Sequence, residues 1–182
     1  ISAKEAVIDL FFMTYKADIE SVTIFPIVKT IGDNAFSGYY SLNKIEFLSP
    51  ITSIGQLAFN GCTALKNFVI PSSVTSVGSY TFYQCTSLVD VTISDSMNEI
   101  ADNMFEQCTS LKNVKIPDSV TKIGYDSFSG CSSLEFISIP ESVETIGDDA
   151  FQGCTSLKEI TIPSSVEDIE YIGVDPGIVK RI

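Results

Sequence analysis

The sequence predicts a solenoid, a coil in which every turn adds one short β-strand to a parallel sheet. Three columns of apolar residues, each with a period of 23 residues, indicate this fold class. One column is Phe36, Phe59, Phe82, Phe105, Phe128 and Phe151. A second is Leu42, Leu65, Leu88, Leu111, Leu134 and Leu157, and a third is Ile31, Ile54, Val77, Ile100, Ile123, Ile146 and Ile169. Self-similarity at a fixed period of about 20–50 residues is the signature of a repeat architecture.

The strand of each turn begins at the column leucine, in a segment of the form L-x-x-I-x-I. In the turn that starts at Leu111, the next apolar residues are Val114 and Ile116. These two residues are two positions apart, which places them on one face of a strand. Pro117 follows directly, and because proline has no backbone N–H, the strand is expected to end there.

The rest of each turn carries a second apolar pair, such as Val120 and Ile123, and then a turn-rich stretch. That stretch reads A/S-F-x-G/Q-C-T/S-S-L, which is typical of a 3₁₀ turn rather than a long helix. One turn buries too few apolar side chains to offset the conformational entropy of its own residues. Each turn is therefore expected to be stable only when it stacks on its neighbours.

The repeated unit I-P-x-S-V-T-x-I-G-x-x-A/S-F-x-G-C-T/S-S-L-K-x-I resembles the BspA-like, or Treponema-type, leucine-rich repeat. The motif runs cleanly from Ile116 through Ile162 and more loosely from Val28 to Ile169. This resemblance implies an α/β-type leucine-rich-repeat solenoid, or horseshoe, with little α-helix. It implies a parallel β-sheet on the concave face, and 3₁₀ or irregular turns and short strands on the convex side.

The pattern divides the chain into three regions. Residues 1–18 are expected to form a degenerate first repeat or an N-terminal cap, with Ile8 and Met13 in the isoleucine and phenylalanine columns. Residues 19–170 form an array of about six to seven repeats of 23 residues. Residues 171–182 form a C-terminal cap or a truncated repeat. Core left exposed at an end of the array would favour end-to-end self-association.

Cysteine and serine also fall into columns of the same period. The cysteines are Cys62, Cys85, Cys108, Cys131 and Cys154. A line of thiols about 5 Å apart suits neither the converging geometry of a disulfide nor the four ligands around a zinc ion. We therefore predict small buried thiols, with no disulfide and no metal. The serines Ser73, Ser96, Ser119, Ser142 and Ser165 are expected to hydrogen-bond the backbone of adjacent turns.

Composition argues against several function classes. A net charge of −12 disfavours nucleic acid and anionic membranes as partners, because both need basic patches. No apolar run approaches the roughly 20 residues that a membrane-spanning helix needs, so direct membrane insertion is not expected. The chain has no histidine, the commonest general base, and no glycine-rich phosphate loop. The sequence therefore predicts no enzyme, no cofactor and no small-molecule substrate.

A partner-binding surface is expected on the concave face, where residues between the buried strand positions point to solvent. The predicted binding residues are Lys44, Lys66, Asn67, Val69, Val89, Asp90, Thr92, Asn113, Lys115, Phe136, Ser138 and Lys158. With its neighbours this face holds five lysines and five acidic residues, so it is neutral on an acidic molecule. Exposed apolar groups among mixed charges are typical of a protein-binding surface, and Phe136 is the best anchor candidate.

The resemblance also implies a function. BspA-like repeats occur in surface proteins of mucosal bacteria and protist parasites, where they are associated with adhesion to host matrix proteins such as fibronectin and fibrinogen. We therefore expect a non-enzymatic protein-binding module that is displayed on the cell surface or secreted. The alternative is an intracellular scaffold or regulatory subunit that uses the same face on a cytoplasmic partner. Free thiols would suit this alternative.

Overall fold

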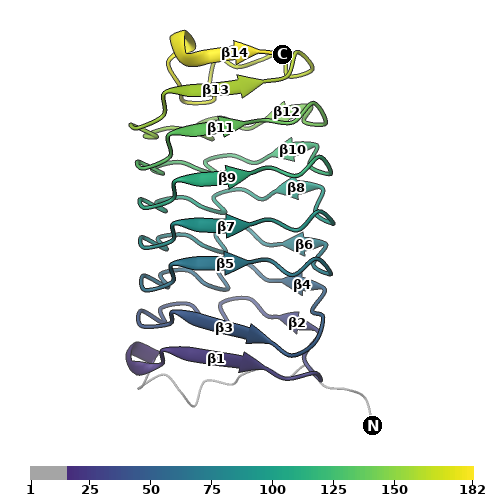
Figure 1. Ribbon diagram of the computed structural model, residues 1–182, viewed down its shortest axis with the longest axis vertical. Coiled ribbons are helices and arrows are strands. Elements are labelled where there is room, and N and C mark those ends of the chain that lie inside the picture. The colour runs from purple at the N-terminus through teal and green to yellow at the C-terminus, as the bar shows by residue number, and fades with distance from the viewer. Residues whose placement is uncertain (1–15) are drawn as a thin grey trace.

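The structure, a computed structural model, describes residues 16–182. Ile8, Met13 and most of the predicted region 1–18 lie outside the described residues. Figure 1 shows a stack of similar turns that rises from the N-terminal to the C-terminal end. The stack is a parallel-strand solenoid, as the repeat predicts, and it contains almost no helix.

One side of the stack carries the longer strands. They are β1 (Ser21–Ile24), β3 (Lys44–Phe47), β5 (Asn67–Val69), β7 (Asp90–Thr92), β9 (Asn113–Lys115), β11 (Phe136–Ser138), β13 (Glu159–Ile162) and β14 (Val179–Arg181). All pairings between them are parallel, and up to β13 paired residues are one repeat apart, as in Ser21 opposite Lys44. The hydrogen-bonded ladder is continuous within β1-β3, β5-β7-β9 and β11-β13-β14. The expected single sheet is thus divided into three hydrogen-bonded groups.

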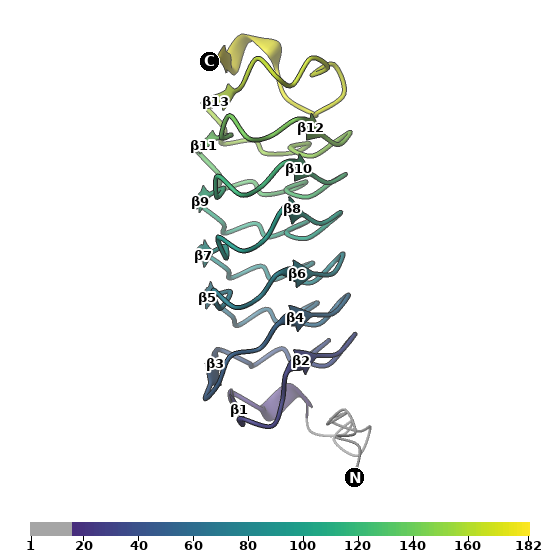
Figure 2. The same ribbon diagram turned by 90° about the vertical axis from the view of Figure 1, so that its right-hand side faces the viewer.

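The return path of each turn carries two-residue strands. They are β2 (Thr30–Ile31), β4 (Ser53–Ile54), β6 (Ser76–Val77), β8 (Glu99–Ile100), β10 (Lys122–Ile123) and β12 (Thr145–Ile146). They form the parallel groups β2-β4-β6 and β8-β10-β12. Figure 2 shows the long and short strands on separate sides of the stack, which is only slightly curved. Over this length the long strands therefore form a nearly flat face rather than a deep horseshoe.

The phenylalanine column forms the centre of the core. All six column phenylalanines are fully or almost fully buried, and successive rings stack with centroids 5.3–5.5 Å apart and planes within 18°. The backbone N–H of each of these phenylalanines also donates to a carbonyl of the following turn, as in Phe105 to Ser127 at 2.8 Å. Each turn is thus joined to the next through both side chain and backbone, which is why the 23-residue period holds without a slip.

The cysteine and serine columns lie as the sequence predicts. All five thiols are free, and each donates to the carbonyl of the phenylalanine in the preceding turn, at 3.1–3.3 Å. Each column serine donates its hydroxyl to a backbone carbonyl of the preceding turn, at 2.6–2.8 Å. Both columns are therefore structural, because they satisfy carbonyl groups between turns.

The chain after the last full repeat covers the final turn. The carbonyls of Tyr171 and Ile172 accept from the backbone of the preceding turn, as a further repeat would. After a 3₁₀ turn η3 (Pro176–Ile178), β14 pairs with β13, with Val179 opposite Ile160. The pairing joins residues 19 positions apart in sequence rather than 23, so the final turn is shorter than the others. At the other end of the described chain lies one further 3₁₀ turn, η2 (Lys16–Asp18).

Candidate protein-binding face

The outward-facing residues of the long strands, with the residue directly before each strand, form a surface that we call the long-strand face. It arises from the two-residue period of a strand. In β5, Asn67 and Val69 are exposed and Phe68 between them is buried. The same exposed-buried-exposed pattern recurs in β7, β9 and β11. Burial of the middle residue fixes which side chains face solvent.

All of the predicted binding residues lie on this face. Exposed are Lys44, Lys66, Asn67, Val69, Asp90, Thr92, Asn113, Lys115, Phe136, Ser138 and Lys158, and Val89 is half-buried. They spread from β3 to β13 rather than converging on one point. Their placement agrees with the predicted register, whereas their role in binding stays a prediction.

Phe136 lies beside Lys158, its neighbour from the next turn. Its side chain is 54% exposed, and the ammonium of Lys158 lies 5.5 Å from the ring centroid. Lys158 also donates a hydrogen bond to Glu135, and this bond lowers the pKa of the Glu135 carboxyl group. The charge of Lys112 lowers the same pKa further, to a smaller extent. Phe136 is therefore partly covered, and less available as an anchor than the sequence implied.

The lysines of the long-strand face divide into two groups. Near the ends, Lys44 pairs with Glu46 at 3.9 Å, and Lys158 and Lys180 pair with Glu135 and Glu159. In the middle, no carboxylate of residues 16–182 lies within 4.0 Å of the ammonium groups of Lys66, Lys112 and Lys115. The centre of the face therefore presents cations that have no carboxylate partner among residues 16–182.

Lys180 is a member of the face that the sequence pattern missed. It lies on β14, where the change from a 23-residue to a 19-residue separation breaks the repeat register. No repeat signal could have placed it, because the columns end at Ile169. Its ion pair with Glu159 shows that β14 continues the long-strand face.

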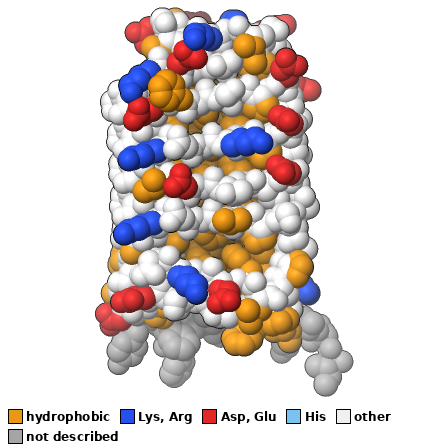
Figure 3. Space-filling view, viewed as in Figure 1, with side chains coloured by type: hydrophobic (Ala, Val, Ile, Leu, Met, Phe, Trp, Pro, Cys, Tyr) orange, Lys and Arg blue, Asp and Glu red, His pale blue; other side chains and the backbone are white. Residues whose placement is uncertain are grey.

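The distribution of charge sets this face apart. Six of the 11 basic residues stand on it: Lys44, Lys66, Lys112, Lys115, Lys158 and Lys180. Only five of the 23 acidic residues do: Glu20, Glu46, Asp90, Glu135 and Glu159. Figure 3 views the face directly and shows basic side chains over its middle, hydrophobic side chains between them, and carboxylates both among these side chains and along one edge. The face is thus close to neutral, while the loops carry the acidic excess.

Acidic loop residues crowd one another on the return path. Burial and the neighbouring charge of Asp149 raise the pKa of the Asp126 carboxyl group, and Asp102 adds a smaller effect. Part of the described chain's negative charge is therefore concentrated on loops away from the long-strand face.

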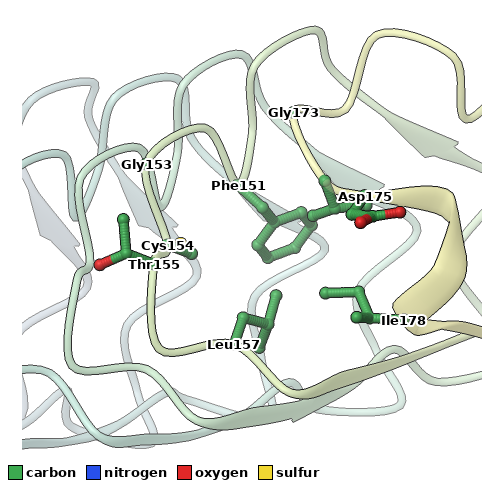
Figure 4. A pocket seen from close by; sticks show the side chains of 9 residues that line it. Phe151, Gly153, Cys154, Thr155, Leu157, Gly173, Asp175 and Ile178 are labelled. Carbon is green, nitrogen blue, oxygen red and sulfur yellow. The ribbon is translucent and has the colours of Figure 1, made fainter.

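A pocket of about 340 Å³ opens at the C-terminal end of the stack. Figure 4 shows Phe151, Leu157 and Ile178 pointing toward a common space, with Asp175 and Thr155 at its edge. The Asp175 carboxylate accepts from the backbone N–H of Gly177, so it caps η3. The ring of Phe151 is itself fully buried, which limits the depth of the pocket.

The groups of this pocket show little nucleophilic character. Burial raises the pKa of the Cys154 thiol to about 12, so this thiol stays protonated near neutral pH. Its hydrogen bond to the carbonyl of Phe128 is one of the contacts that join adjacent turns. The pocket is therefore better explained by the shorter final turn of the coil than by a reaction centre.

Neither a metal cluster nor a membrane-spanning helix is found in the described chain. Residues 16–182 contain no group of three or more His, Cys, Asp or Glu side chains arranged to hold a metal ion. In the same part of the chain, no helix has the length and apolar character to cross a membrane. The long-strand face therefore remains the strongest candidate site among these residues.

Comparison with solved structures supports the fold. A leucine-rich repeat protein of Treponema pallidum is 32% identical, with a TM-score of 0.73, over 78% of this chain and 68% of that chain. A leucine-rich cell surface protein of Faecalibacterium prausnitzii A2-165 is 25% identical, with a TM-score of 0.50, over 79% and 60%. The pneumococcal vaccine antigen PcpA shares the fold, at 23% identity and a TM-score of 0.53, over 82% and 40%. This chain thus spans less than two thirds of the length of the last two proteins.

The sequence comparisons identify the repeat itself. Six copies of the BspA-type leucine-rich repeat match residues 8–135 and 127–173. No curated protein matches this chain significantly. Leucine-rich repeats of this kind indicate a protein-interaction module, and the fold is generally non-enzymatic. The described turns, their columns and the matched repeats agree: this chain belongs to the BspA-type leucine-rich-repeat family.

Proposed function

We propose that this protein is a non-enzymatic adhesion module, displayed on the cell surface or secreted, that binds host or matrix proteins through its long-strand face. One observation carries the proposal. The long-strand face is nearly neutral and exposes Val69 and Phe136, whereas the chain as a whole carries a net charge of −12. Apolar side chains surrounded by polar and charged groups are what a protein interface of moderate size requires.

Rigidity supports the same use of the face. Stacked phenylalanines and backbone hydrogen bonds join every turn of the described repeats to the next. The backbone of such a scaffold loses little conformational freedom on binding, and this lowers the entropic cost of association. Strands about 4.8 Å apart give a face roughly 30 Å long, which suits one domain or an extended segment of a partner.

The proposed location rests on a relative. The Faecalibacterium prausnitzii protein, which shares the fold at 25% identity, is described as a cell surface protein. The free cysteines do not favour an intracellular scaffold instead. Burial raises the pKa of the Cys62 and Cys154 thiols to about 12, and raises the other three well above the ordinary value. Thiols that are buried and protonated react slowly in either compartment.

A binding assay with matched variants tests the proposal. The protein is passed over immobilised fibronectin, fibrinogen and other matrix proteins, beside the variant Lys66→Glu/Lys115→Glu. Its control is Lys29→Glu/Lys122→Glu, which makes the same charge change at exposed positions off the long-strand face. We expect saturable binding that the first variant loses and the control keeps. Absence of saturable binding, or equal binding by all three proteins, would overturn the proposal.

A further inference from the structure

The centre of the long-strand face combines apolar side chains with lysines that have no ion-pair partner in the described part of the chain. Lys66 directly precedes β5, Lys112 directly precedes β9, and Lys115 ends β9. Val69 ends β5, and the register of the ladder places Val69, Thr92 and Lys115 in one row across three strands. We call the region bounded by Lys66, Val69, Lys112 and Lys115 the central patch. Of the four corners of this patch, three are lysines and the fourth is the exposed Val69.

From this arrangement we propose that the central patch binds an acidic polypeptide segment that carries an apolar side chain among its carboxylates. The proposal deepens the proposed function, since it names the chemistry of the partner that the long-strand face would take. The three ammonium groups supply the charge complementarity. Between these ammonium groups, Val69, which is 62% exposed, and Val89, which is half-buried, supply apolar contact.

Spacing favours an extended peptide. Lys112 and Lys115 are three residues apart on one strand, which separates their Cα atoms by about 10 Å. Lys66 lies two turns from Lys112 in the same column, again about 10 Å away. Carboxylates three to four residues apart in an extended segment span about the same distance. The exposed amides of Asn67 and Asn113 flank Asp90 in the middle of the patch and can donate to the backbone of such a segment.

Lysines elsewhere on the face do not compete for this ligand. Lys44, Lys158 and Lys180 each have a carboxylate partner in the protein, so a ligand would have to displace an existing ion pair. At the central patch a ligand carboxylate meets an ammonium group without that cost. At about 0.15 M salt, exposed charges more than about 8 Å apart are largely screened. Contacts in the patch therefore depend on its own lysines more than on the net charge of the chain.

A nucleic acid fits the patch less well than an acidic peptide. Each strand of a duplex carries one phosphate per about 3.4 Å of helix axis, so phosphates would lie against Asp90 and Glu135 as well as against the lysines. Three cations also neutralise too few phosphates to release many counterions from a nucleic acid. Sparse carboxylates on a polypeptide can contact the lysines and avoid the acidic side chains.

Fluorescence anisotropy with defined peptides tests this proposal. The probes are labelled Gly-Glu-Gly-Val-Gly-Glu-Gly-Val-Gly-Glu-Gly, its glutamine counterpart and its lysine counterpart, with labelled oligo-dT as the nucleic acid probe. We expect the acidic peptide to bind at least about tenfold more tightly than the other three, a difference of about 1.4 kcal/mol. The variant Lys112→Glu/Lys115→Glu should weaken acidic-peptide binding by about tenfold or more, and the control Lys29→Glu/Lys122→Glu by less than about twofold.

The outcomes separate this proposal from the proposed function. Equal binding of the acidic and glutamine peptides, tighter binding of oligo-dT, or equal losses in both variants would overturn the acidic-segment proposal. If a matrix protein still binds and the Lys66→Glu/Lys115→Glu variant still loses it, the proposed function stands although the ligand chemistry is wrong. If the acidic peptide binds the patch but no matrix protein binds the face, the proposal of a matrix-protein partner is wrong, whereas the proposed ligand chemistry is supported.

Discussion

Replacement of Phe105 by alanine measures how much the stacked column stabilises the solenoid. Phe105 is fully buried in the middle of the described turns, and its ring stacks on Phe82 at 5.5 Å and on Phe128 at 5.4 Å. Truncation of a buried phenylalanine to alanine costs about 3–5 kcal/mol. A stacked aromatic pair contributes about 0.5–1.5 kcal/mol beyond burial, and Phe105→Ala removes two such pairs. We expect a loss in the upper part of this range, about 4–5 kcal/mol.

A second variant separates stacking from burial. Phe151 is equally buried but stacks on one column neighbour, Phe128, at 5.5 Å. Phe151→Ala should therefore cost about 0.5–1.5 kcal/mol less than Phe105→Ala. The free energy of unfolding is measured by urea denaturation followed by circular dichroism, because the chain has no tryptophan.

Hydrogen exchange monitored by mass spectrometry shows whether the whole array or only some turns respond, since repeat arrays can depart from two-state unfolding. A loss below about 1 kcal/mol for Phe105→Ala would refute the account of the core. Equal losses in the two variants would refute the contribution assigned to stacking.

Three other predictions concern the serine column, the buried hydroxyl of Ser127 and the cysteine column. Ser119→Ala removes the hydroxyl that donates to the carbonyl of Met97 at 2.6 Å, and should lower the free energy of unfolding by about 1 kcal/mol in urea titrations; no loss would contradict a structural role for the serine column. Ser127→Ala should leave stability unchanged or raise it by up to about 1 kcal/mol, because this buried hydroxyl has no hydrogen-bond partner among the described residues; a clear loss would reveal a partner. Burial raises the pKa of the Cys62 and Cys154 thiols from 9.0 to about 12, so the folded state holds its thiol protons more tightly than the unfolded state. This contribution to stability is complete below about pH 9 and is lost as the pH rises toward about 12. A Cys62→Ala/Cys154→Ala variant should therefore show a shallower decline with pH in thermal melts.

Much of the fold can be predicted from the sequence because each turn repeats the same pattern of apolar, polar and turn-forming residues. The columns at Phe105, Leu111 and Ser119 predicted which side chains are buried and which satisfy the backbone, and the structure confirms all three. A residue that recurs at a fixed period in a coil meets its own counterpart in the next turn. Burial and register could therefore be derived without knowledge of any long-range contact.

Other features depend on packing that the repeat does not encode. Leu57 and Tyr80 adopt a left-handed backbone conformation, with φ of 56° and 58°, which Leu and Tyr do not favour, although the other four positions of this loop column hold Asn or Asp, which do. The backbone of the stacked turns imposes this conformation. By contrast, the repeat does mark Gly147, the glycine of its I-G pair, where a Cβ would lie 2.5 Å from the backbone nitrogen of Tyr125. The 19-residue final pairing has no counterpart in the columns.

The position of the candidate face could be predicted from the sequence, but the ion pairs of its lysines could not. Alternation along the strands placed Lys66 and Lys115 in solvent, as the structure shows. Which lysines pair internally depends on side-chain conformations across neighbouring turns. Lys158 lies over Phe136 and hydrogen-bonds Glu135, so the predicted anchor is partly covered. The face lysines with no carboxylate partner among residues 16–182 are Lys66, Lys112 and Lys115.

Lysine footprinting of a bound complex tests most directly whether the long-strand face is the binding surface. The protein is acetylated with a limiting reagent, alone and in complex with whichever matrix protein it binds, and the reaction rate at each lysine is measured by mass spectrometry. We expect Lys66, Lys112 and Lys115 to be protected severalfold in the complex, while Lys29 and Lys122 on the return path react at unchanged rates. Protection of Lys29 and Lys122 with no change at the three central lysines would contradict the account.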